Sequence, residues 1–117
     1  MTAIHNVGQF PEGRWDYFEL SELDDDYDLR PVRALNIDEA WYWYGSGSYE
    51  GTGLMLMRRG DLYDFASLGH CSCYGPTDYI RFDGKPFDKL VTKASDELLR
   101  ELRPLLAAAR PETYGGA

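Results

Sequence analysis

Cysteine is scarce in this chain of 117 residues. Its two cysteines, Cys71 and Cys73, are separated by a single residue, so they cannot cross-link distant loops as a disulfide-stapled scaffold requires. No apolar run approaches the roughly 20 residues of a membrane-spanning helix, and the first residues lack the basic and apolar segments of a secretory signal. We therefore expect one cytoplasmic domain over 1–117 without membrane contact, beginning with an extended lead-in (1–13) and ending in a frayed tail (111–117).

Positive charge is scarce in the first part of the chain. Residues 1–50 hold eleven acids but only three arginines, whereas residues 51–117 hold nine charges of each sign. The whole net charge of −8 therefore belongs to residues 1–50. A field of this sign repels nucleic acid and attracts basic proteins. Direct binding of DNA or RNA is therefore not expected.

The densest acidic run (21–28) predicts a loop, with a short helix capped by Ser21 as the alternative. Three of its aspartates have the spacing of the first three calcium ligands of an EF-hand. Leu29 and Leu35, however, stand where that motif requires glycine and glutamate. The run is therefore interpreted as solvated charge or as a surface for a basic partner. The candidate partner-binding residues are Glu22, Asp24, Asp25, Asp26, Tyr27 and Asp28.

Aromatic residues alternate along one run, and this predicts a central strand. In residues 39–45, Trp41 and Trp43 share one face and the two intervening tyrosines share the other. Gly60-Asp61, between two apolar runs, predicts the turn of a β-hairpin. The predicted strands are about 14–20, 30–35, 39–45, 53–59 and 61–68. We expect an α+β fold, with an antiparallel sheet of four or five strands and a C-terminal helix packed on one face.

The C-terminal helix is predicted from apolar residues that recur at steps of three and four over residues 87–109. Pro104 lies inside this pattern, lacks a backbone donor and should kink or split the helix. We therefore expect a regular helix over 95–103 and a bent continuation over 104–110.

The segment 68–76 holds both cysteines beside a histidine, and three interpretations compete. A soft metal could use His70, Cys71 and Cys73, but a closed zinc site needs a fourth ligand and His5 is the only other histidine. A cysteine nucleophile needs a base within hydrogen-bond reach, and in an extended chain His70 points to the opposite side. The third interpretation, a tight turn with small buried thiols, is favoured because free cysteine is among the most buried residue types.

Catalytic residues and cofactors are not predicted. The glycine-rich run 45–53 lacks the spacing of a P-loop or of a dinucleotide-binding loop. The question of enzymatic activity therefore stays open, with a non-enzymatic protein favoured. The sequence does not determine the oligomeric state.

One part of the sequence resembles a group of small, mostly uncharacterised bacteriophage proteins. They share a Tyr-Glu-Gly turn, here Tyr49-Glu50-Gly51, then a hairpin, then Gly-His-Cys-Ser-Cys-Tyr-Gly-Pro, here residues 69–76. The resemblance covers about residues 42–80 and carries no established activity. It implies a phage accessory protein that acts in the cytoplasm of an infected bacterial host.

The leading functional hypothesis is a small acidic phage accessory protein that binds and modulates or inhibits a basic-surfaced protein of the host or the phage. Mimicry of a nucleic acid is one form of it. The alternatives are a metal-binding protein that uses cysteine and histidine, and an antitoxin-like or immunity-like neutraliser.

Overall fold

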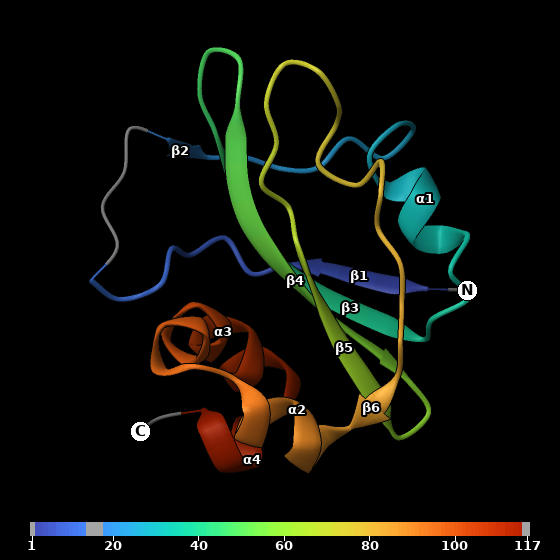
Figure 1. Ribbon diagram of the computed structural model, residues 1–117, viewed down its shortest axis with the longest axis vertical. Helices are drawn as coiled ribbons and strands as arrows, with labels where there is room; N and C mark the ends of the chain where they lie inside the picture. The colour runs from blue at the N-terminus through green and yellow to red at the C-terminus, as the bar shows by residue number, and fades with distance from the viewer. Residues whose placement is uncertain (1, 14–17, 116–117) are drawn as a thin grey trace.

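The computed structural model describes residues 2–13 and 18–115. It has an α+β fold in which the helices that follow the last strand lie together on one side of the sheet (Figure 1). Its elements, in chain order, are β1 (Ala3–Asn6), β2 (Glu19–Leu20), α1 (Leu29–Arg33), β3 (Glu39–Ser46), β4 (Gly51–Arg59), β5 (Leu62–Ser67), β6 (Lys85–Pro86), α2 (Phe87–Lys93), α3 (Asp96–Ala109) and α4 (Pro111–Tyr114). No helix within the described ranges is long and apolar enough to cross a membrane.

The sheet is mixed and open, with the order β1-β3-β4-β5-β6 and with β2 paired to the far end of β3. β1 runs parallel to β3, with Ala3 opposite Glu39, whereas the other neighbours are antiparallel. The prediction of a purely antiparallel sheet is therefore wrong. The lead-in 1–13 contributes the extra strand, and the long crossover through β2 and α1 supplies the connection that a parallel pair needs.

The central strand and the hairpin are confirmed. β3 pairs along its whole length with β4, and β4 pairs with β5. The turn between β4 and β5 includes Gly60, whose φ of 58° is a left-handed conformation that glycine adopts at little cost. Two-residue hairpin turns require such values, and Gly60-Asp61 is therefore the signal that located this turn.

The C-terminal helices pack on one face of the sheet, as predicted, and the structure shows that this is the face of Trp41 and Trp43. Trp41 and Trp43, with leucines of β4, pack against Leu102, Leu105 and Leu106 of α3. The indole Nε1 of Trp43 also donates a hydrogen bond to the carbonyl of Glu101 at 2.9 Å. This buried donor therefore fixes the position of α3 as well as filling the core.

The tyrosine face of the sheet is covered by α1, in a segment (30–35) that was predicted to be a strand. That prediction is wrong. Leu29 and Val32 are three residues apart, and a helix turns both into the core beside Tyr42 and Tyr44. Pro31 is tolerated because it lies in the first turn, where the missing N–H would have no partner within the helix.

The predicted helical region 87–109 is divided just before Ser95, where the regular helix was expected to begin. α2 ends at Lys93, and the side chain of Ser95 accepts a hydrogen bond from the N–H of Leu98 at 3.1 Å to begin α3. α3 then continues through Pro104 to Ala109, so the expected continuation is present and Pro104 does not split the helix. Pro104 is buried in the stripe that packs on the sheet, and this packing compensates for the lost backbone bond.

Both ends of the chain differ from the sequence prediction. Residues 111–114 form α4 rather than a frayed tail, because the ring of Tyr114 packs on Phe87 with centroids 6.0 Å apart. Of the described part of the predicted strand 14–20, Glu19 and Leu20 form strand, as β2. Residues 14–17 lie outside the described ranges.

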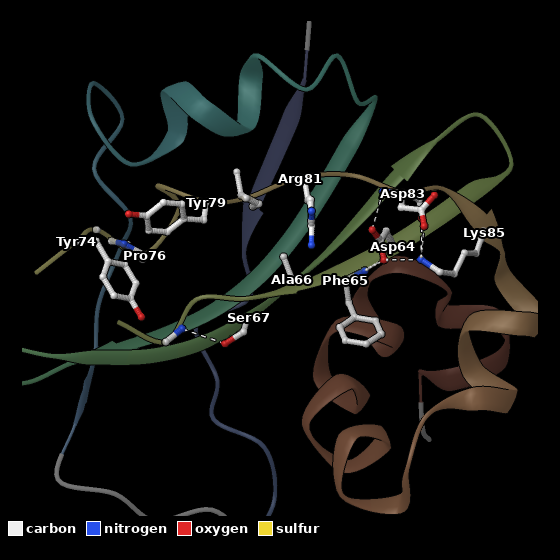
Figure 2. Close-up of a pocket in the computed structure, with 13 residues that line it drawn as sticks. Asp64, Phe65, Ala66, Ser67, Tyr74, Pro76, Tyr79, Arg81, Asp83 and Lys85 are labelled. Carbon is white, nitrogen blue, oxygen red and sulfur yellow. Dashed lines mark hydrogen bonds and ion pairs between the residues drawn. The ribbon is translucent and has the colours of Figure 1, made fainter. Parts of the chain in front are cut away.

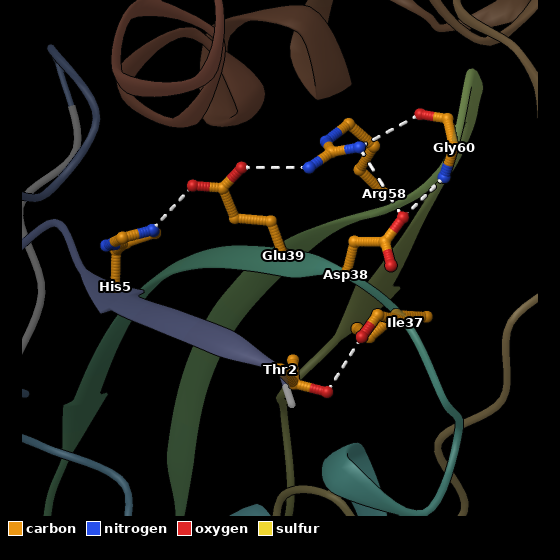
Figure 3. Close-up of polar contacts among 7 residues, drawn as sticks. All are labelled: Thr2, His5, Ile37, Asp38, Glu39, Arg58 and Gly60. Atoms are coloured by element: carbon orange, nitrogen blue, oxygen red, sulfur yellow. Dashed lines mark hydrogen bonds and ion pairs between the residues drawn. The ribbon is translucent and has the colours of Figure 1, made fainter.

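A chain of polar contacts ties the edge strand β1 to the hairpin (Figure 3). His5 Nε2 lies 2.8 Å from Glu39 Oε2, and the other oxygen of Glu39 accepts from Arg58 at 3.2 Å. Asp38 accepts from the N–H of Gly60 at 2.7 Å. These residues come from β1, β3, β4 and the turn, so the network fastens one end of the sheet.

Candidate functional site

The acidic run (21–28) forms a loop whose conformation is fixed by hydrogen bonds within it. Asp24 Oδ1 accepts from the N–H of Tyr27 at 2.7 Å, and Asp28 Oδ2 accepts from the N–H of Asp24 at 2.9 Å. The N–H of Leu29, where α1 begins, donates to the carbonyl of Asp24 at 3.0 Å. Two carboxylates are therefore held in fixed directions, and the predicted loop is confirmed.

Four of the six predicted partner-binding residues surround one open cavity of about 620 Å³, together with apolar residues of β1, α1 and β3. They are Glu22, Asp24, Asp25 and Asp28. The cation among the lining residues is Arg33, whose guanidinium lies 3.1 Å from Asp25. Both partners of this pair are largely exposed, so the pair contributes little to stability.

The negative potential of this cavity acts on a tyrosine in its wall. The hydroxyl of Tyr42 accepts a hydrogen bond from the N–H of Leu23 at 3.1 Å. Burial raises the pKa of Tyr42, and the negative charges of Glu22, Asp25 and Asp28 raise it further. The carboxylates therefore act together at one point on the surface.

The other two predicted residues do not line the cavity. Asp26 contributes its main-chain carbonyl, which accepts from Arg30 at 2.6 Å. Tyr27 is 60% exposed, and one edge of its ring lies against Gly75. The structure therefore assigns Tyr27 to the contact with the loop 74–79 rather than to the cavity.

His70 is held by the sheet. It exchanges two backbone hydrogen bonds of 3.1 Å with Gly51, and its Nε2 lies 2.5 Å from the hydroxyl of Tyr44. Nδ1 lies 3.0 Å from the carbonyl of Cys71, which can only accept, so Nδ1 carries the proton. In the neutral ring Nε2 therefore accepts from Tyr44, and neither nitrogen is left to serve as a base for a thiol.

The two cysteines are exposed, so the favoured interpretation of a turn with buried thiols is wrong. The turn is instead held by the His70 contacts. The N–H of Cys73 donates to Cys71 Sγ at 3.4 Å, and this bond, with a second from the Cys73 thiol, lowers the pKa of Cys71. The hydrogen bond to Cys71 raises the pKa of Cys73. Within the described residues, histidine, cysteine and acidic side chains form no group of three or more that could hold a metal.

A cleft of about 770 Å³ lies between β5 and the chain that returns over residues 74–83 (Figure 2). At one end Asp64, only 8% exposed, accepts from the N–H groups of Phe65 and Asp83 at 2.9 and 2.7 Å. Lys85 Nζ lies 3.3 Å from the same carboxylate. Sequence reasoning missed this cleft, although an acid inside the apolar run 62–66 was a signal for it.

Comparison with family models, with curated proteins and with solved structures finds no match. The candidate sites are therefore ranked by geometry. The acidic cavity gathers most of the predicted partner-binding residues. In the cysteine segment both nitrogens of His70 are already hydrogen-bonded, and the β5 cleft includes the cations Arg81 and Lys85.

Proposed function

We propose that this chain is a small acidic protein that binds and inhibits or modulates a protein with a basic surface. The observation that carries the proposal is the convergence of Glu22, Asp24, Asp25 and Asp28 on one cavity. The resemblance of residues 42–80 to phage proteins supports a setting in the cytoplasm of an infected bacterial host. A nucleic-acid-binding protein would offer the most complementary surface, with the carboxylates in place of phosphates.

The geometry favours binding for two physical reasons. Backbone N–H groups already orient Asp24 and Asp28, so less side-chain entropy is lost when a cation binds there. Single exposed ion pairs contribute only about 0–1 kcal/mol, but several acids on one surface act together and steer a basic partner. Binding should therefore weaken steeply as salt is added.

The decisive experiment compares two variants of equal net charge. The cavity variant carries Glu22→Gln, Asp24→Asn, Asp25→Asn and Asp28→Asn, and its amide oxygens can still accept the internal hydrogen bonds of the loop. The control carries Glu12→Gln, Asp61→Asn, Asp88→Asn and Glu97→Gln, at four exposed sites away from the cavity. Each variant changes the net charge from −8 to −4.

Immobilised wild-type protein should capture basic proteins from bacterial lysate at low salt and release them as salt rises. The cavity variant should lose this capture and the control should retain most of it. Duplex DNA should displace the captured protein if the surface imitates a nucleic acid. Equal behaviour of the two variants would contradict the proposal, because it would reduce the effect to net charge. A toxin neutraliser would use the same surface, and the identity of the captured protein distinguishes it from an inhibitor.

Metal binding is a second candidate because Cys71 and Cys73 are both exposed and the N–H of Cys73 contacts Cys71 Sγ. A soft metal held by both thiolates would complete its coordination with ligands from a partner molecule. Elemental analysis of the purified protein tests this. One equivalent of zinc or iron that disappears in the Cys71→Ser/Cys73→Ser variant would support it.

A further inference from the structure

β5 has an open edge along the cleft. β6 pairs only with Leu62 and Tyr63. The N–H of Leu68 donates to Gly53 on β4, and alternation along an antiparallel strand therefore turns the main-chain groups of Phe65 and Ser67 away from β4. In the part of the chain that the structure describes, the N–H and carbonyl of Ser67 and the carbonyl of Phe65 have no hydrogen-bond partner.

Asp64 keeps this edge open. The β5–β6 register, continued backwards, would place residue 83 opposite residue 65. Instead, the Asp64 carboxylate accepts from the N–H groups of both Phe65 and Asp83, and it stands where the next ladder hydrogen bonds would form. The returning chain therefore runs beside β5 without pairing with it, which leaves a cleft with one strand edge as its wall (Figure 2).

The opposite wall of the cleft carries a cationic side chain, Arg81, and two tyrosine rings. Arg81 points from the returning chain toward β5 (Figure 2) and makes no hydrogen bond or ion pair with a described residue. Lys85, by contrast, is occupied by Asp64 and Asp83. The rings of Tyr74 and Tyr79 pack edge to face, 5.5 Å apart, and Tyr79 is 80% exposed.

We propose that this cleft binds an extended peptide segment of a partner protein, which adds to the free edge of β5 and places an acidic side chain against Arg81. The main-chain groups of Ser67 and Phe65 would bond the peptide backbone, and the tyrosines would contact its apolar side chains. A small anion would leave the strand edge unused. The acidic peptide also distinguishes this site from the acidic cavity, whose proposed partner is basic.

The backbone part of the proposal is tested at Ser67. Ser67→Pro removes the outward N–H and leaves the β4 ladder intact, because that N–H does not face β4. Ser67→Ala is the matched control, since it removes the hydroxyl, which accepts from Gly69, but keeps the N–H. The probe is a positional library of N-acetylated, C-amidated hexapeptides, from which the tightest member is measured by fluorescence anisotropy and by amide shifts at residues 65 and 67. We expect Ser67→Pro to weaken binding about tenfold and Ser67→Ala to leave it nearly unchanged.

The carboxylate part is tested at Arg81. Wild-type protein should select aspartate or glutamate at one peptide position, and Arg81→Gln should lose that preference by about tenfold or more. Arg100→Gln, on the exposed face of α3, should keep it.

Single N-methylations along the peptide should abolish binding only at alternate positions, a readout that does not depend on how well Ser67→Pro folds. Failure of every library member to bind, equal binding by the two Ser67 variants, or an unchanged acid preference in Arg81→Gln would overturn the proposal. Loss of capture in the cavity variant tests the other site separately.

Discussion

Replacing Asp64 tests whether one buried carboxylate holds the β5–β6 end of the sheet together. Its two oxygens accept from the N–H groups of Phe65 and Asp83, and the side chain is 12% exposed. Asparagine has one acceptor oxygen, so its amide N–H₂ must face one of the two donors. A buried N–H that loses its acceptor costs about 1–3 kcal/mol.

The other partner of Asp64 contributes less. Lys85 is 40% exposed, and solvent screening limits the contribution of its ion pair to about 1 kcal/mol or less. We therefore expect Asp64→Asn to lower the free energy of unfolding by about 2–3 kcal/mol. Asp64→Ala, which leaves both donors unmatched, should lower it by about 3–5 kcal/mol. Lys85→Gln should cost no more than about 1 kcal/mol.

The assay is urea unfolding at neutral pH, followed by tryptophan fluorescence because Trp41 and Trp43 are buried. The comparison requires an unchanged m-value, so that a shifted midpoint reports stability. Asp83→Asn is the control, because its exposed side chain changes while its main-chain N–H remains. An Asp64→Asn variant as stable as the wild type within about 0.5 kcal/mol would show that the carboxylate does not hold this end of the sheet, and so would a Lys85→Gln variant that costs as much as Asp64→Ala.

Three further predictions use the same unfolding assay. Tyr42→Phe leaves the N–H of Leu23 without its acceptor and should cost about 1–2 kcal/mol. The folded-state pKa of Tyr42 lies above its ordinary value of 10.0. The stability that the neutral hydroxyl contributes is therefore complete below pH 10 and is lost as pH rises through the folded-state pKa. The Tyr42→Phe variant should accordingly lose less stability in alkali than the wild type. Gly51→Ala places a Cβ 2.6 Å from His70 Nε2 and should cost about 1–3 kcal/mol; a neutral result would show that the His70 contact is loose. Leu105→Ala, at a fully buried site, should cost about 2–5 kcal/mol, and a cost below about 1 kcal/mol would contradict the assigned packing of α3.

Long periodic segments could be predicted from the sequence because their signal is local. The alternation of tryptophan and tyrosine in 39–45 identifies a strand with two buried faces, and β3 has this form. Gly60-Asp61 located the hairpin for a similar reason, since its turn requires a positive φ. The apolar stripe of 87–109 identified the helical region, and the start of the regular helix at residue 95 agrees with the cap at Ser95.

Short segments could not be predicted because tertiary contacts decide their conformation. The run 30–35 holds Pro31 and three apolar residues, a composition compatible with an edge strand or with a first helical turn. The helical conformation is favoured because it buries Leu29 and Val32 together against the tyrosine face of the sheet. β1 likewise has little pattern of its own and is fixed by its pairing with β3. Composition could identify the acids but not their convergence on one cavity.

The two proposed sites are connected by tertiary contacts that no local sequence pattern predicts. Thr77, only 1% exposed, donates its hydroxyl hydrogen to the carbonyl of Asp28, 49 positions away. The ring of Tyr27 also lies against Gly75. The acidic loop and one wall of the β5 cleft are therefore fastened to each other, so a substitution at Thr77 should disturb both. Asp25 lines the cavity and Ser67 lines the cleft, so variants at these two residues can assign an interaction to one site or to the other.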